Sequence, residues 1–349
     1  MKKGYIFYYD FIKIVAAFMV CFYHLGMLDV GVVTDGYYIP NSNKIILNLC
    51  AMSVPLFFMV NGSLMLRRRY SVKEIILRAL KIFFLYFFWV IVVGEIGVAF
   101  LQMDRVPLHR IWLGKRSPLA VHLWFLKTLG ILTILLPVLK KIYDLKDKKY
   151  LYGIMICLFI FPFTYNYFAL AMRWFKIECF NRLSVTGAAT MYSVLYFFLG
   201  KMISDFSARQ ETDCKKYKLL AVFMLLLGWL LITIEVTLWS SIKGTVYDGV
   251  NSSFPTIGAL FMAMGAFYLC SRIKVKQDRN FVKIVRILAD NIMGIYIFHN
   301  ICIPFVYWYV SGNNTILKSV IITLLIMLVT TGVTCMIKKI PILKEVVNI

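Results

Sequence analysis

Three ionisable side chains interrupt the first long apolar run of the chain, which covers residues 5–28. Asp10, Lys13 and His24 fall there within the stretch YYDFIKIVAAFMVCFYHLG. In a helix, Lys13 and His24 are about three turns apart, or roughly 16 Å, and Asp10 lies within roughly 40° of the same stripe. Charged groups are costly in hydrocarbon, so we expect this stripe to face a bundle interior or a wet cavity.

A histidine on such a stripe can take up and release a proton near neutral pH. Plainer interpretations stay open for each residue. Asp10 and Lys13 are spaced as an ordinary i, i+3 ion pair at a helix entry, with Lys13 reaching toward the interface. His24 alone is also compatible with a packing histidine that has its hydrogen bonds satisfied.

Further polar or aromatic side chains fall in or beside later apolar runs: His122, Trp124, Tyr296, His299, Glu95 and Glu235. Tyr296 and His299 are one helical turn apart, so they share a face. Trp124 has the position of an ordinary interfacial tryptophan. Glu95 and Glu235 are candidates for binding a polar ligand or for pairing with Lys127, and the sequence does not decide between these roles.

The elements that position these residues follow from composition. Of the 349 residues, 61% are hydrophobic, and the mean hydropathy is +0.77, so the chain is a membrane protein. Runs of about 20 apolar residues are long enough to cross a bilayer as helices, and no short alternating strands suggest a barrel. We predict an all-α, polytopic transmembrane bundle forming a single domain over residues 1–349. About ten spans are expected, at 5–28, 45–66, 78–101, 119–139, 150–168, 188–204, 217–238, 255–272, 288–310 and 315–337.

The distribution of charge sets the orientation. Most of the 39 lysines and arginines lie in alternate loops, which predicts that both termini are cytoplasmic. The net charge of +22 therefore reflects topology, and no nucleic-acid motif accompanies it. We interpret MKKGYIFYYD as the start of a retained helix rather than of a cleaved signal peptide. The eight cysteines lack metal-ligand spacing, so no metal site is expected.

Several motifs follow one another in a recognisable order. The first motif is a basic residue, ten further residues and then a histidine, which is Lys13 to His24 here. An acid precedes the basic residue in YYDFIK. This motif is followed by MSVPLFFMVNGSLML, RALKIF, HLWFLKTLGILTILLPVL, YFFLGKMIS and NIMGIYIFHNICIP. Taken together, and over the whole chain, they resemble the membrane acyltransferase 3 family. The sequence departs from that family's pattern at Asn61, where a serine is usual, and at Lys81, where an arginine is usual.

The resemblance implies a membrane-bound O-acyltransferase of the plasma membrane. Such an enzyme moves an acyl group, expected to be acetyl, from cytoplasmic acyl-CoA to a hydroxyl of an extracytoplasmic surface polysaccharide. His24, Asp10 and Lys13 would be the catalytic residues. Arg78, Lys81 and Arg68 would bind the donor phosphates, although Lys81 lacks the bidentate geometry of arginine. The residues expected to bind the acceptor are His122, Trp124, Tyr296, His299, Asn61 and Glu95.

Two other classes of protein stay open. A transporter of a small solute or lipid-linked glycan would also keep ionisable residues in its spans. A non-catalytic scaffold of a glycan-synthesis complex is the second alternative, and only the enzyme would release free CoA. The expected partners are the lipid bilayer, acyl-CoA as donor and the glycan acceptor, with no tightly bound cofactor and no nucleic acid. The acyl group, the acceptor and a homo-oligomeric state are left open.

Overall fold

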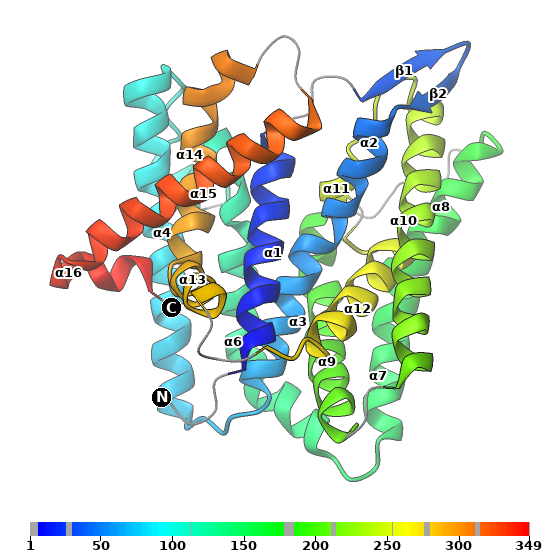
Figure 1. Ribbon diagram of the computed structural model, residues 1–349, viewed down its shortest axis with the longest axis horizontal. Coiled ribbons are helices and arrows are strands. Elements are labelled where there is room, and N and C mark those ends of the chain that lie inside the picture. The colour runs from blue at the N-terminus through cyan, green and yellow to red at the C-terminus, as the bar shows by residue number, and fades with distance from the viewer. Residues whose placement is uncertain are drawn as a thin grey trace. The chain divides into compact units, whose positions relative to one another are not determined.

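The computed structural model describes residues 6–25, 30–112, 114–177, 185–210, 214–252, 254–275, 280–310 and 315–348. Most of them are helical, so the predicted helical membrane protein is confirmed (Figure 1). Within these residues, seven helices are long and apolar enough to cross a membrane, and two shorter apolar helices accompany them. Each predicted span contains a helix, although the boundaries differ by several residues.

The chain divides into two compact units. The first comprises Met1–Arg68 and Val138–Ala289, and the second comprises Arg69–Pro137 and Asp290–Ile349. The boundary falls inside α6 (Trp124–Asp144), directly after Pro137. The single domain predicted over residues 1–349 stays a prediction.

The first unit contains most of the helices. Its elements are α1 (Phe7–His24), β1 (Gly31–Thr34), β2 (Tyr37–Pro40), α2 (Ser42–Leu47), η1 (Asn48–Met52), α3 (Ser53–Met65), α7 (Lys149–Phe159), η3 (Ile160–Thr164), α8 (Tyr165–Trp174), α9 (Val185–Arg209), α10 (Lys215–Lys243), α11 (Gly249–Ser252), α12 (Ile257–Ser271) and α13 (Asn280–Asp290). In this unit α1 packs against α3, α3 against α9, and α10 against α12.

Close contact between α3 and α9 depends on two glycines. A Cβ atom at Gly62 would lie 2.0 Å from the carbonyl oxygen of Phe197. A Cβ at Gly200 would lie 2.0 Å from the carbonyl oxygen of Met59. Small residues let helix backbones approach closely in membrane proteins, where dispersion contacts replace the hydrophobic effect as the driving force. The asparagine–glycine pair of α3 is therefore part of a backbone-to-backbone contact.

A short hairpin departs from the all-α prediction. Strands β1 and β2 pair antiparallel, with Gly31 opposite Pro40 and Thr34 opposite Tyr37. Asp35 and Gly36 form the turn with φ values of 51° and 79°, because the preferred two-residue turn requires positive φ at both positions. The hairpin contacts α10 through the Tyr38 amide, which donates to Ser241 Oγ at 2.9 Å.

Helix α13 is a second departure, because its residues were expected to form a loop and the start of the ninth span. It is amphipathic, and its Val282 and Val285 are buried against Phe7 of α1. The following helix begins at Ile292 rather than at residue 288. With 11 residues, α13 is too short to cross a bilayer.

The second unit is smaller. Its elements are α4 (Val72–Leu101), α5 (Leu108–Trp112), η2 (Pro118–Leu123), the first part of α6, α14 (Ile292–Val310), α15 (Ile316–Lys338), α16 (Pro341–Lys344) and η4 (Glu345–Val347). Helix α4 begins with a capping box, in which Ser71 and Glu74 satisfy each other's backbone amides. In this unit α14 packs against α15, and η2 contacts both α4 and α14.

The α3–α9 contact generates a stability prediction. The Gly62→Ala variant should be destabilised by about 1–3 kcal/mol, because overpacking against a backbone carbonyl forces the helices apart. Thermal unfolding of the detergent-solubilised protein measures the effect. Gly153→Ala in α7 is the matched control, since a Cβ there meets nothing within 4 Å. A Gly62→Ala variant that unfolds at the wild-type temperature would contradict this packing.

Candidate active site

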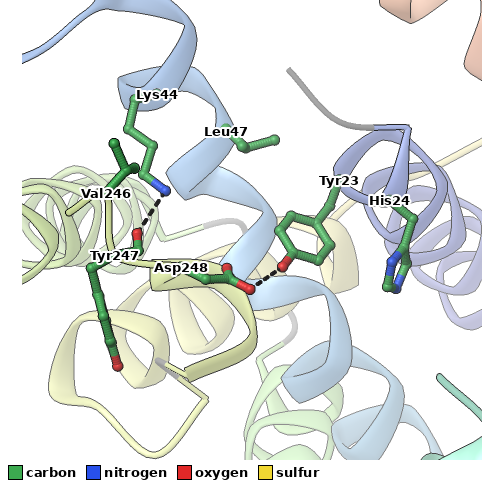
Figure 2. A pocket seen from close by; sticks show the side chains of 7 residues that line it. All are labelled: Tyr23, His24, Lys44, Leu47, Val246, Tyr247 and Asp248. Atoms are coloured by element: carbon green, nitrogen blue, oxygen red, sulfur yellow. Dashed lines mark hydrogen bonds between the residues drawn. The ribbon is translucent and has the colours of Figure 1, made fainter. Parts of the chain in front are cut away.

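His24 lies in an open pocket of about 310 Å³ in the first unit (Figure 2). The lining residues are Tyr23, His24, Lys44, Leu47, Val246, Tyr247 and Asp248. They come from the last turn of α1, from α2, and from the segment that follows α10. That these segments lie on the extracytoplasmic side stays a prediction from the distribution of charge.

The segment after α10 is held by local hydrogen bonds. Helix α10 ends at Gly244, which adopts a left-handed conformation with φ of 65°, as is common where a helix stops. The Tyr247 amide then donates to Ser240 Oγ at 2.9 Å. Asp248 accepts from the Val250 amide at 3.2 Å through Oδ1, which places its side chain at the start of α11. The position of Asp248 is therefore set by the backbone around it.

Asp248 connects the residues of the pocket. The Tyr23 hydroxyl donates a hydrogen bond to its Oδ2, as Figure 2 shows. Its carboxylate also interacts electrostatically with His24 and with Lys44. A carboxylate near an imidazole favours the positive charge that the ring gains when it takes up a proton. The pocket thus contains a base and a group that supports it.

Asp248 and Lys44 were not found by sequence reasoning. Asp248 is an exposed acid in a polar loop and belongs to no motif. Lys44 is at the start of an apolar run, where lysine ordinarily reaches to the interface. In the structure its side chain is only 3% exposed, and its Nζ donates to the Tyr247 carbonyl at 3.1 Å. The place of each residue in the pocket becomes evident only from contacts between segments far apart in the sequence, Asp248 with Tyr23 and Lys44 with Tyr247.

The other end of α1 carries the remaining residues of the predicted stripe. Lys13 Nζ lies 2.7 Å from Asp10 Oδ1, so the i, i+3 ion pair left open by the sequence is formed. Both side chains are mostly shielded, with 23% and 15% exposure. Nearby, the hydroxyls of Tyr8 and Tyr9 bond to Ser204. A catalytic or steering role for Asp10 and Lys13 stays a prediction.

Asn61 and Arg68 are the other predicted site residues of the first unit. Asn61 Nδ2 donates at 2.8 Å to the carbonyl of Phe57 in its own helix. That bond uses one amide hydrogen and leaves the side-chain oxygen as an acceptor. Arg68 is exposed just after the end of α3. Neither residue lines the pocket around His24.

The second unit brings three predicted acceptor residues together. The ring centroids of His122 and His299 are 4.8 Å apart, and those of His122 and Tyr296 are 5.3 Å apart. The Tyr296 hydroxyl donates to the His122 carbonyl. Asn300, which sequence reasoning missed, donates to the Leu119 carbonyl at 2.8 Å. The cluster thus couples η2 to α14 through hydrogen bonds and ring contacts.

The contacts of His299 define its tautomer. Its Nδ1 lies 3.2 Å from the Ile295 carbonyl, and a carbonyl only accepts, so Nδ1 carries the hydrogen of the neutral ring. Nε2 is then the basic nitrogen. His299 is fully buried and His122 is 4% exposed. The pair therefore lies inside the second unit.

Trp124 and Glu95 lie elsewhere in the second unit. Trp124 is half-buried in the first turn of α6. Glu95 is exposed and forms a 2.5 Å ion pair with Arg105. The ion-pair partner of Glu95 is therefore Arg105, whereas the sequence suggested Lys127.

The predicted donor cations are one turn apart on α4. Arg78 extends over the ring of Tyr70, with its guanidinium carbon 5.7 Å from the centroid. Its buried Nε has no hydrogen-bond partner among the described residues. Lys81 instead pairs with Glu345 at 2.5 Å. Two further contacts hold the C-terminal segment to this unit: Trp89 Nε1 donates to the Val346 carbonyl at 2.7 Å, and Val347 is fully buried.

Comparison with known proteins connects these features to a family. Residues 6–338 match the family described as an acyltransferase domain. No curated protein and no solved structure matches the chain significantly. The match covers nearly the whole chain. It includes the pocket around His24, the histidine cluster of the second unit and the apolar helices that suit a multi-pass membrane protein. The chain therefore belongs to the acyltransferase 3 family of membrane acyltransferases.

Proposed function

We propose that this acyltransferase moves an acyl group, in the first place acetyl, from cytoplasmic acyl-CoA to a hydroxyl of an extracytoplasmic surface glycan. The observation that carries the proposal is the pocket at the end of α1, where His24 and Asp248 lie together. The pocket is open, so a polymer-borne hydroxyl can reach it. The positive-charge bias supports the outer location of this end, and a plasma-membrane setting follows from a surface acceptor.

The transfer is a proton-coupled substitution at the thioester carbon. His24 takes the proton from the acceptor hydroxyl, whose oxygen attacks the thioester carbon and forms the new C–O bond. The tetrahedral intermediate collapses, the C–S bond breaks, and the CoA sulfur leaves with the proton that His24 returns. Asp248 stabilises the imidazolium between these steps. Transient acylation of His24 is the alternative route to the same product.

The donor is held by cations near the cytoplasmic side. Arg78 has an unused buried N–H among the described residues, and its guanidinium is suited to phosphate. Lys81 is one turn away on the same helix. His122, Tyr296, His299, Trp124, Asn61 and Glu95 stay our candidates for binding the acceptor, of which the first three form the buried cluster. Arg68 would attract the anionic donor, and the Asp10–Lys13 pair would hold open the cytoplasmic mouth of the donor path to His24.

The catalytic role of His24 is tested by His24→Gln, which keeps a polar side chain but cannot shuttle protons at neutral pH. Acyl transfer should fall by about 10²–10⁴-fold, because a general base is lost. Mass analysis of the surface glycan and release of free CoA from acetyl-CoA measure it. The exposed His109 supplies the control, and His109→Gln should keep full activity. Near-normal acylation by His24→Gln would favour a transporter's ion path or a structural network.

The donor role of Arg78 is tested by binding. Arg78→Ala should weaken acetyl-CoA binding about tenfold, because hydrogen bonds to charged groups contribute about 1.5 kcal/mol or more. Titration of the purified protein with acetyl-CoA gives the dissociation constant. The exposed Lys73 on the same helix is the control, and Lys73→Ala should bind acetyl-CoA as the wild type does. Equal affinity in folded Arg78→Ala would refute the phosphate contact.

Glu345 tests whether Lys81 also contributes. The hydrogen bond from Lys81 holds the pKa of Glu345 below its usual range, so at neutral pH this carboxylate is ionised and competes with donor phosphates. Glu345→Gln should therefore tighten acetyl-CoA binding about three- to tenfold. Asp147→Asn is the control, because this exposed acid pairs with Lys149 in the first unit. Unchanged or weaker binding by Glu345→Gln would remove Lys81 from the donor site.

A further inference from the structure

Lys44 is a buried amine without an evident structural need for its charge. Its side chain is 3% exposed, and its backbone is already fixed because its amide donates to the Asn41 side chain that caps α2. An ammonium group offers three N–H donors. Only the Tyr247 carbonyl accepts from Nζ among the described residues. Lys44 thus retains donor capacity next to an open pocket.

Keeping such a group is costly. Burying an amine without full hydrogen bonding costs several kcal/mol, and an apolar side chain of the same length would avoid that cost. Its neighbour in the lining, Leu47, shows that the site accepts apolar residues. Asp248 offsets part of the cost by electrostatic attraction. The remaining N–H donors are available to an acceptor atom of a ligand in the pocket that Lys44 lines.

The chemistry of the pocket identifies that acceptor atom. Lys44 and Asp248 have opposite charges, so together they do not select an anionic ligand. A neutral ligand with a carbonyl oxygen fits better, and negative charge develops on that oxygen during acyl transfer. Donors placed at a developing oxyanion are among the strongest contributions to catalysis.

We infer that Lys44 is a further catalytic residue, whose N–H groups donate to the carbonyl oxygen of the acyl group during attack by the acceptor. This inference rests on the proposed function. As the acceptor oxygen bonds to the thioester carbon, the carbonyl electron pair moves onto the oxygen, and Lys44 stabilises the negative charge. When the C–S bond breaks, the pair returns to re-form the carbonyl. The acceptor proton goes to His24 and then to the departing sulfur.

The test is steady-state kinetics of the full chain in lipid nanodiscs, with acetyl-CoA and a deacylated surface-glycan fraction, following release of free CoA. Lys44→Met keeps the length of the side chain but removes its donors. We expect kcat to fall about 10²–10³-fold, with KM for acetyl-CoA within about threefold of wild type. Lys44→Arg, which keeps N–H donors, should recover part of the lost kcat.

Lys243→Met is the matched control. Lys243 is exposed, contacts the ring of Tyr247 at 4.7 Å and does not line the pocket. It should keep the wild-type kcat, since only a nearby surface charge is lost.

Three results would overturn the inference. Lys44→Met with kcat within about threefold of wild type would exclude the oxyanion contact. Equal losses of activity in Lys44→Met and Lys44→Arg, together with a lower unfolding temperature, would show that Lys44 only ties α2 to Tyr247. A folded wild-type protein that releases no CoA would overturn the proposed function itself, and the inference with it.

Discussion

Every polar group that this chain buries among its apolar helices requires a compensating partner, because hydrocarbon and apolar side chains offer none. The pairing of Tyr23 with Asp248 and of Lys44 with the Tyr247 carbonyl meets part of that requirement around the pocket. These same contacts connect α1, α2 and the segment after α10. The constraint that makes polar residues expensive in the bundle is therefore also what assembles the candidate site.

The arrangement of the first unit explains how a site can be open and still firmly held. Gly62 and Gly200 bring the backbones of α3 and α9 together, and α1 packs on α3. Helix α1 is thus packed on a closely associated helix pair, while Asp248 is positioned by its own backbone contacts. Preorganised groups on rigid elements need little rearrangement when a substrate enters.

The candidate residues of the second unit include a buried pair of histidines and two cations on α4. Its histidine pair is buried, with His299 fixed in one tautomer by the Ile295 carbonyl. Its α4 cations have contrasting surroundings, because Lys81 is paired with Glu345 while the buried Nε of Arg78 has no hydrogen-bond partner among the described residues. Arginine is the better phosphate ligand of the two. Arg78 is consequently the stronger candidate for binding the proposed acyl-CoA donor. The charge of Lys81 is already paired with Glu345 of the C-terminal segment.

Local patterns in the sequence were sufficient for the features that depend on neighbours along the chain. The apolar runs predict the helices because bilayer thickness dictates their length, and the spacing of Asp10 and Lys13 predicts the ion pair that forms. The Asp35-Gly36 dipeptide also carries a local turn signal. Even the order of short motifs along the chain was enough to indicate the family.

Only the tertiary structure decided which distant residues meet. Asp248 lies far along the chain from Tyr23, and no periodicity connects a loop acid to the end of the first helix. Lys44 had the sequence position of an interfacial lysine, yet packing buries it beside the pocket. The physical reason is that helical periodicity specifies which face of a helix is polar, whereas contacts between segments depend on packing among all the helices of a unit.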